Sequence, residues 1–273
     1  MVVRYMHERG FVHGDLHRGN ILLRLQSQFN FDKLSTKEPY ELYGEPDLEP
    51  VNRYDGQPPP AGVPKHGVVP IWLGASSEKV TLLEASIVLT DFGETFCQAR
   101  EKRFGSRTPL PIRPPESRFE PTQSLTFSSD IWTLACTIWD IVAQRSLFEG
   151  FLTDEDEMTC QQIAALGPLP REWWGRWEGR RNHFNDSGEL NTRATSQYGS
   201  LEVAFELFVR EARVREGMSP FGSGERDAFF EMMRSMLAFR PEERLSAQQV
   251  LEAEWKVKWA VPEYEKIRSE RES

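Results

Sequence analysis

The sequence predicts one mostly helical (mostly α) domain with a small amount of strand near its start. Two observations favour this fold class. The segment 129–143 is apolar on nearly all of its sides, which is typical of a buried helix and not of a surface helix. Several later segments repeat apolar residues at helical spacing and begin beside good capping residues. With 273 residues, of which 39% are apolar, the chain can build one large domain around its own core.

The remaining helices are predicted from apolar spacing and from the residues at their ends. Residues 2–9 form an apolar face that stops at Gly10, and glycine often follows the end of a helix. Ser246 and Gln249 have the spacing of a capping box, which marks the start of another helix. The other predicted helices are 154–166 behind the N-cap Thr153, 201–213 behind Ser200, 225–238, and 247–255.

Two short apolar runs, 20–24 and 86–90, are predicted to be strands that can pair with each other. The stretch between them is rich in charge and proline, and Pro58, Pro59, Pro60 and Pro64 argue against regular structure there. We therefore expect one domain over residues 1–263. It would contain an insertion over about 26–84 that is not a separate domain. A charged tail follows at 264–273.

The chain is acidic, with 33 Lys and Arg against 42 Asp and Glu and a formal net charge of −9. Nucleic acids and membrane surfaces are anionic, so neither is an expected direct partner, whereas a basic protein is. The three cysteines, Cys97, Cys136 and Cys160, lack metal-binding spacing. Such a sparse set favours a reducing compartment, the cytoplasm or the nucleus. No apolar run reaches the about 18 residues that a membrane span requires.

The loop before the first predicted strand carries residues that point to chemistry. Asp15 and Asn20 lie five residues apart in the run His-Gly-Asp-Leu-His-Arg-Gly-Asn at 13–20. In phosphoryl transfer an aspartate accepts the proton of the attacking hydroxyl, and an asparagine oxygen is a hard ligand for Mg²⁺. A polar turn is the alternative explanation of this loop. Asp91-Phe92-Gly93 follows the second predicted strand and offers a further metal-binding carboxylate, although this tripeptide alone is common.

Three more motifs follow along the chain: Pro114-Pro115-Glu116, Asp130-Ile131-Trp132 at the start of the buried helix, and Arg244 before the last capped helix. Together with the two loops, their order and spacing resemble the C-terminal lobe of a eukaryotic protein kinase over about residues 1–259. The long insertion resembles that of the kinases that phosphorylate arginine/serine-rich splicing proteins. The phrases His-Gly-Asp-Leu-His and Ile-Arg-Pro-Pro-Glu are similar to a fungal branch of that group. The implied fold is a kinase-like C-terminal lobe, in which a short β-hairpin bears the catalytic loop and the Asp-Phe-Gly.

The resemblance implies roles at the reacting centre. Asp15 is expected to be the catalytic base, and His17 stands where a lysine usually reaches the γ-phosphate. Asn20 and Asp91 are expected to hold Mg²⁺ and, through it, ATP. Leu22 is expected beneath the adenine ring, or else belongs simply to the strand core. The implied reaction is ATP-dependent phosphorylation of Ser or Thr in a protein substrate, with basic Arg/Ser-rich proteins as the expected class.

The resemblance also implies structural roles. His13 and Phe92 are expected in the hydrophobic stack that aligns the site, and Asp130 is expected to hold the backbone around His13. Glu116 and Arg244 are expected to form a buried ion pair that anchors the activation segment. Loss of either member should strongly destabilise the fold, because the remaining charge would be buried without a partner.

Besides His17, the sequence departs from the kinase pattern in two further respects. Gly14 replaces the arginine that normally pairs with a phosphate on the activation segment, so phosphorylation of Ser106 or Thr108 loses its main electrostatic reason. Only 12 residues precede His13, and neither a glycine-rich loop nor a Val-Ala-Ile-Lys strand occurs. We therefore expect a C-terminal lobe whose N-terminal lobe is missing, with weak or no phosphoryl transfer by this chain alone.

A non-catalytic interaction module with a kinase fold is the main alternative function. It leaves unexplained why Asp15, Asn20 and Asp91 are all present. A small-molecule phosphotransferase shares the His-Gly-Asp-Leu-His phrase but lacks the later motifs. The acids at 154–157 either contact a basic substrate or, more simply, provide favourable charge at a helix N-terminus.

Overall fold

The computed structural model describes residues 1–24, 35, 37–71, 80–83, 85–185, 188–190 and 199–272. The chain divides into two compact units, a helical unit of residues 1–22 with 88–273 and a small unit of residues 23–87. The predicted insertion of about 26–84 falls within the small unit. No helix of the described residues is long and apolar enough to cross a membrane.

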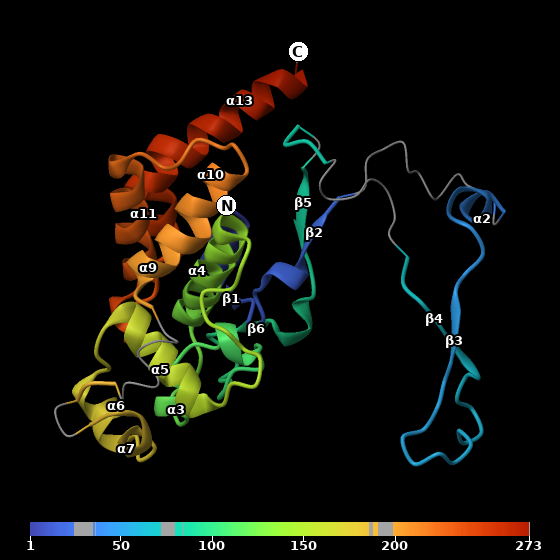
Figure 1. The fold of residues 1–273 in the computed structure, drawn as a ribbon, viewed down its shortest axis with the longest axis horizontal. Helices are drawn as coiled ribbons and strands as arrows, with labels where there is room; N and C mark the ends of the chain where they lie inside the picture. The colour runs from blue at the N-terminus through green and yellow to red at the C-terminus, as the bar shows by residue number, and fades with distance from the viewer. Residues whose placement is uncertain are drawn as a thin grey trace. The chain divides into compact units, whose positions relative to one another are not determined.

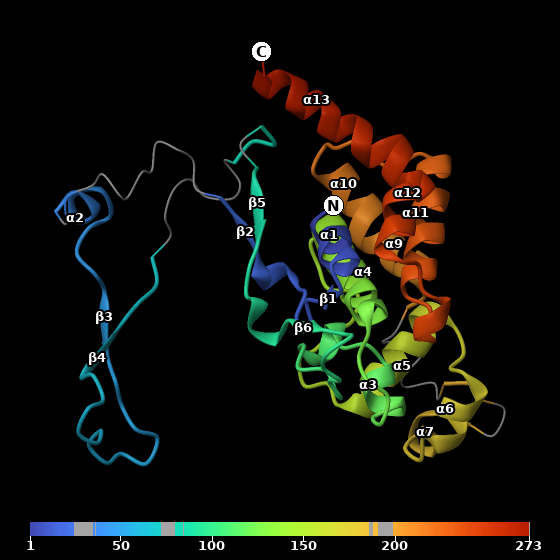
Figure 2. The same ribbon diagram turned by 180° about the vertical axis from the view of Figure 1, so that it is seen from behind.

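The helical unit is built around α4 (Phe127–Ala143), the helix predicted from its all-round apolar composition. Figures 1 and 2 show α4 at the centre of this unit, and α11 (Ser223–Met236) packs on it. The side chains of Trp132 and Trp139 on α4 are completely buried. A capping box between Thr126 and Ser129 begins the helix. The prediction of a buried central helix is confirmed.

In chain order, the other helices of this unit are α1 (Val2–Glu8), α3 (Glu116–Phe119), α5 (Glu155–Leu166), α6 (Arg171–Arg176), α7 (Arg180–His183), α9 (Leu201–Phe205), α10 (Glu211–Arg215), α12 (Ala247–Glu252) and α13 (Val261–Glu272). A π-helical turn over Glu206–Arg210 joins α9 to α10, and another over Lys256–Ala260 precedes α13. Short 3-10 helices lie at η1 (Arg18–Asn20), η4 (Phe92–Glu94), η5 (Leu110–Ile112) and η7 (Pro241–Glu243).

The predicted helix ends are confirmed in part. Ser200 and the box of Ser246 with Gln249 cap their helices as expected. The N-cap of α5 is Asp154 and not Thr153, because the Asp154 carboxylate accepts the Glu157 backbone N–H at 2.8 Å. The charged tail from 264 continues as the helix α13.

Two short antiparallel strand pairs occupy the part of the helical unit where strand was predicted. β2 (Ile21–Leu23) pairs with β5 (Ile87–Leu89), which confirms the expected pairing of the two apolar runs. β1 (Phe11–Val12) pairs with β6 (Phe96–Cys97) in the register Phe11 to Cys97 and Val12 to Phe96. Val12 and Phe96 are buried and form a small second core with Leu125.

The small unit contains regular structure that the prolines were expected to prevent. It holds α2 (Glu38–Tyr43) and an antiparallel pair of β3 (Leu48–Pro50) with β4 (His66–Val68). The prediction was wrong because Pro58, Pro59, Pro60 and Pro64 all lie between the two strands, where no ladder hydrogen bond is required of their nitrogen atoms.

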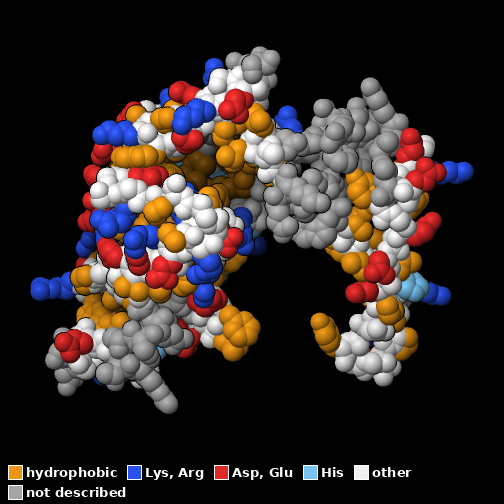
Figure 3. Space-filling model, turned by 45° about the horizontal axis from the view of Figure 1, so that its top comes forward, with side chains coloured by type: hydrophobic (Ala, Val, Ile, Leu, Met, Phe, Trp, Pro, Cys, Tyr) orange, Lys and Arg blue, Asp and Glu red, His pale blue; other side chains and the backbone are white. Residues whose placement is uncertain are grey.

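Charges of both signs cover the helical unit. Figure 3 shows Lys and Arg side chains interspersed with Asp and Glu over its visible face, so the acidic balance does not gather there into one patch. Surface ion pairs such as Arg4 with Glu8 and Lys258 with Glu254 join neighbouring turns of helices. Pairs this exposed contribute little to stability, so the fold depends on its core.

Candidate active site

The strand pairing brings two loops of the helical unit together. Residues 13–20 connect β1 to β2, and residues 90–95 connect β5 to β6. Because β1 pairs with β6 and β2 pairs with β5, each loop begins and ends beside the other. The loop predicted to carry the base and the loop predicted to carry a metal ligand are therefore neighbours.

Hydrogen bonds from Thr90 and Thr95 join the two loops directly. The backbone N–H and the hydroxyl of Thr90 both donate to the backbone oxygen of Asn20, at 2.8 and 3.1 Å. The Nε2–H of His13 donates to the Thr90 oxygen at 3.2 Å, and the Thr95 hydroxyl donates to the His13 oxygen at 3.2 Å. Asp91 is bonded to Thr90 along the chain, so these contacts hold it next to the first loop.

Asp15 and Asn20 form the centre of the first loop. The Asn20 amide nitrogen donates to the Asp15 backbone oxygen at 2.8 Å and to its Oδ2 at 3.4 Å. Because this nitrogen points to Asp15, the amide oxygen is the atom of Asn20 that can bind a metal ion. Asp15 Oδ1 is buried and has no hydrogen-bond partner among the described residues. A buried acceptor without a donor is costly unless a ligand supplies one, so Oδ1 suits an incoming hydroxyl group.

His17 lies beside Asp15 in a defined tautomer. Its Nδ1 accepts the backbone N–H of Gly19 at 3.0 Å, so the proton of the neutral ring is on Nε2. The distance from Nε2 to Asp15 Oδ2 is 3.6 Å, which is longer than a hydrogen bond. The ring therefore presents an N–H group next to the carboxylate.

Asp91 begins η4 in a left-handed backbone conformation, with φ 59° and ψ 69°. Its Oδ1 accepts the backbone N–H of Gly93 at 3.4 Å, and the residue is exposed. Residues other than glycine adopt this conformation at a cost of about 1–2 kcal/mol, and such strain gathers at functional sites. The strained turn directs Asp91 out of the strand and leaves its carboxylate accessible.

His13 and Phe92 contact each other beside this site. The His13 side chain is buried, and its ring centroid lies 5.3 Å from that of Phe92. His13 Nδ1 accepts the Asp15 backbone N–H at 3.3 Å, which fixes both ring nitrogens. Leu22 lies on β2 with half of its surface exposed, so it is not a core residue of the described structure.

The buried carboxylate of Asp130, on α4, binds the backbone at the start of the loop 13–20. Its Oδ2 accepts the His13 backbone N–H at 2.7 Å, and its Oδ1 accepts the Gly14 backbone N–H at 3.0 Å. His7 on α1 donates from Nε2 to Oδ2 at 2.9 Å. Charge-assisted bonds to backbone donors are among the stronger ones, so α4 positions the residues before Asp15.

Glu116, the first residue of α3, forms a buried ion pair with Arg244. Arg244 Nη1 donates to Glu116 Oε1 at 2.8 Å, and Nη2 donates to Oε2 at 2.6 Å. The guanidinium also donates to the backbone oxygens of Ser128 and Phe239, and it lies over the Trp132 ring. The end of the segment 91–116 is thereby joined to the core.

The available metal donors fit Mg²⁺ better than a soft metal. No group of three or more His, Cys, Asp and Glu side chains in the described ranges converges to hold a metal ion. The site offers instead the carboxylate of Asp91 and the amide oxygen of Asn20. Hard oxygen donors in small number are typical of Mg²⁺, which completes its shell with water and substrate phosphates.

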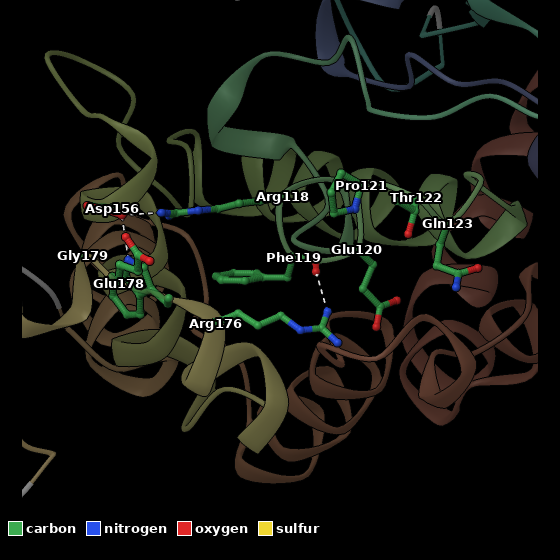
Figure 4. Close-up of a pocket in the computed structure, with 11 residues that line it drawn as sticks. Arg118, Phe119, Glu120, Pro121, Thr122, Gln123, Asp156, Arg176, Glu178 and Gly179 are labelled. Carbon is green, nitrogen blue, oxygen red and sulfur yellow. Dashed lines mark hydrogen bonds and ion pairs between the residues drawn. The ribbon is translucent and has the colours of Figure 1, made fainter.

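A separate pocket of about 740 Å³ lies between α3 and the α6–α7 region (Figure 4). Its two arginines already have partners: Arg118 binds the Thr159 hydroxyl at 2.6 Å and the Asp156 carboxylate, and Arg176 donates to the Phe119 oxygen at 3.1 Å. None of the predicted site residues lines it. This pocket is therefore separate from the residues that carry chemistry.

Comparison with known proteins connects this geometry to a fold. No protein family model matches the chain. A serine/threonine protein kinase of Aspergillus fumigatus is 28% identical over 62% of this chain and 39% of its own length. A serine/threonine-protein kinase of Arabidopsis thaliana is 25% identical over 62% of this chain and 40% of its own length. A probable serine/threonine-protein kinase of Dictyostelium discoideum is 24% identical over 90% of this chain and 22% of its own length.

A solved kinase domain superposes on 93% of this chain and on 62% of its own chain, with a TM-score of 0.54 and 17% identity. The chain has a protein kinase fold. Its curated relatives carry the names of serine/threonine kinases, and the chain spans about two fifths of the length of the Aspergillus and Arabidopsis relatives. The assignment of residues 13–20 as a catalytic loop and of residues 91–116 as an activation segment is part of the proposal below.

Sequence reasoning missed several residues that position this kinase-fold site. His7, Thr90, Thr95 and Arg103 make side-chain bonds to the two loops or to residues that hold them. Thr90 directly precedes the Asp-Phe-Gly, which is a signal that could have drawn attention to it. His7 and Arg103 have ordinary local surroundings in the sequence, and only the folded structure shows what they bind.

Proposed function

We propose that this chain provides the catalytic and metal-binding part of an ATP-dependent protein kinase that phosphorylates Ser or Thr. The observation that carries the proposal is the buried Asp15 Oδ1, which lacks a partner among the described residues and lies beside Asn20. Asn20 in turn is bonded to Thr90, the residue before Asp91. This arrangement supports a hydroxyl-activating carboxylate next to a pair of oxygen donors for Mg²⁺.

Each of these residues has a distinct task in the proposed reaction. Asp15 orients the substrate hydroxyl and accepts its proton at Oδ1. Asn20 and Asp91 hold Mg²⁺, which when bound with ATP neutralises phosphate charge. His17 offers its Nε2–H beside Asp15 as a hydrogen-bond donor to a phosphate oxygen. Asp130 and Asn20 keep the loop rigid, so that catalysis depends on positioning and on charge stabilisation.

We propose basic, Arg/Ser-rich proteins as the substrate class. The resemblance of the insertion and of the loop phrases to splicing-factor kinases supports it, as does the net charge of −9. The acids at the start of α5 do not add support, because they have partners within the fold. Asp154 caps α5, Asp156 binds Arg118 and Trp177, and Glu155 lies near Arg113.

The phosphates of ATP require further groups. In protein kinases a glycine-rich loop covers the phosphates, and a lysine binds them. This sequence contains neither motif, so we propose that efficient transfer needs an upstream kinase lobe. A non-catalytic module with the same fold is the second candidate.

Calorimetric titration with ATP and Mg²⁺ tests the proposal. The chain is compared with a fusion that carries the upstream lobe of the Aspergillus relative, and phosphoryl transfer to an Arg/Ser-repeat peptide is measured in parallel. We expect the fusion to bind nucleotide and to transfer phosphate. Asp15→Asn should keep nucleotide binding and lose transfer, and Asp91→Asn should lose the Mg²⁺-dependent part of binding.

The control is Asp227→Asn, which removes an exposed carboxylate on α11. It should change neither binding nor transfer. A fusion that binds no nucleotide would contradict the kinase proposal. A fusion that binds nucleotide but transfers no phosphate to any peptide would favour the non-catalytic module.

A further inference from the structure

The catalytic loop and the activation segment touch backbone to backbone at Gly14. Gly14 has φ +82°, and a Cβ atom there would lie only 2.6 Å from the backbone oxygen of Glu94. No other residue fits without moving one of the two loops. Gly14, which precedes Asp15, is therefore packed directly on Glu94, which follows the Asp-Phe-Gly.

Arg103 holds Glu94 in place on the other side of this contact. Its Nη1 donates to the Glu94 backbone oxygen at 2.9 Å and to the Glu94 carboxylate at 3.0 Å. Its Nε donates to Glu101 at 2.7 Å, and its guanidinium lies over the Phe96 ring. The oxygen that Gly14 packs against is thus the same oxygen that Arg103 binds.

The backbone of Arg103 is itself fixed to the core. Its carbonyl oxygen accepts the backbone N–H of Leu125 at 2.7 Å. Leu125 is buried with Val12 and Phe96 in the small second core. A continuous series of contacts therefore runs from this core through Arg103 and Glu94 to Gly14.

The hydroxyl groups that a regulating phosphate could occupy are already engaged. Thr108 is 1% exposed, and its hydroxyl pairs with that of Ser106 at 2.7 Å. The guanidinium of Arg113 binds the Thr108 backbone oxygen at 3.2 and 3.1 Å. The two hydroxyl groups and the Thr108 backbone oxygen thus have partners within the segment.

We propose that Arg103 is a positioning residue that fastens the activation segment to the catalytic loop through Glu94. The inference rests on the proposed function for its catalytic consequence, but the fastening itself is a property of the fold. Arg103 and Glu94 are partly exposed, so the pair acts through geometry more than through net stability.

Hydrogen exchange of the full chain tests the fastening without nucleotide. Arg103→Gln should speed amide exchange by about tenfold in both 96–104 and 13–20, because the two stretches open together. Arg103→Lys keeps the positive charge but loses the planar guanidinium with its several donors. Its exchange rates should lie between those of the parent and of Arg103→Gln. The matched control is Arg107→Gln, since Arg107 is 80% exposed and lies 3.7 Å from the same Glu94. It should leave both stretches unchanged.

Faster exchange in 96–104 with an unchanged 13–20 would overturn the proposal, as would an equal effect of Arg107→Gln. In the lobe fusion, Arg103→Gln should lower kcat by about tenfold or more with KM for ATP nearly unchanged, because the base is displaced and not the nucleotide. A fusion that transfers no phosphate would contradict the proposed function, while the exchange data would still decide the role of Arg103.

Discussion

Arg244 binds both carboxylate oxygens of Glu116 with two parallel hydrogen bonds, although 128 residues separate the two in the sequence. The Arg244 side chain is completely buried, and that of Glu116 is nearly so. Backbone oxygens of Ala238, Ser128 and Phe239 accept the other donors of the guanidinium. The pair is fully hydrogen-bonded, which is the condition under which a buried ion pair is tolerated.

Removal of one member of this pair should be strongly destabilising. Glu116→Gln leaves the Arg244 guanidinium buried without a counter-charge, and we expect a loss of about 3–5 kcal/mol in the free energy of unfolding. Urea unfolding measures it. Glu172→Gln is the control, because Glu172 pairs with Arg240 on the surface and should cost less than about 1 kcal/mol. Equal costs for the two variants would show that Glu116 does not compensate a buried charge.

The Asp130 carboxylate should hold the backbone of His13 and Gly14 in place without help from His7. Asp130→Asn replaces one acceptor oxygen with an N–H donor, so either the His13 or the Gly14 backbone N–H loses its partner. We expect a cost of about 1–3 kcal/mol and faster exchange of those two amides. His7→Gln leaves both backbone bonds in place and should keep the two amides protected. Fast exchange of the His13 and Gly14 amides in the His7→Gln variant would mean that His7 is needed to hold this backbone.

The sequence was sufficient to predict the parts of the fold that depend on local pattern. An all-round apolar run gave α4, and the capping box of Ser246 with Gln249 placed α12. The motif residues Asp15, Asn20 and Asp91 were found by spacing, and the structure brings their loops together through β1, β2, β5 and β6. These features are encoded within a few residues of where they act.

Other features could not be predicted because they depend on contacts between residues distant in the sequence, or because two adjacent residues were equally good candidates for one role. Arg103 is one of several charged residues around position 100, and only its contact with the Glu94 oxygen distinguishes it. The hairpin of β3 with β4 was missed because the prolines between its strands were taken to exclude the strands as well. Thr153 and Asp154 are both good caps, and the reciprocal bond with Glu157 decides between them.

Asp140 on α4 should make the stability of the helical unit depend on pH. Burial raises the pKa of its carboxyl above the ordinary value, although the positive charge of Arg18 and a hydrogen bond from Ser146 act in the opposite direction. Its buried Oδ1 has no hydrogen-bond partner in the part of the chain that the structure describes. The folded state therefore holds this proton more tightly than the unfolded state, so the contribution of Asp140 to stability is present at low pH and lost as pH rises through the folded pKa.

The variant Asp140→Asn is neutral at every pH and tests this dependence. Its Tm should exceed that of the parent near about pH 7, and the difference should shrink toward about pH 4, where the parent carboxyl is protonated. Thermal unfolding at both pH values measures the change. Asp227→Asn, on the exposed surface of α11, should show no such trend. A Tm for Asp140→Asn below the parent at neutral pH would mean that the charged form of Asp140 is the stabilising one.

The start of α5 offers a test of which residue caps it. Asp154→Ala removes the acceptor for the Glu157 backbone N–H, although the Glu157 side chain can still accept the backbone N–H of residue 154. We expect a loss of about 0.5–2 kcal/mol, measured by thermal or urea unfolding. Thr153→Ala removes only a long 3.4 Å contact to the Phe151 oxygen and should change stability by less than about 0.5 kcal/mol. If Thr153→Ala proved the more damaging of the two, the helix would begin one residue earlier in solution, and the acids of its first turn would be displaced from Arg118 and Trp177.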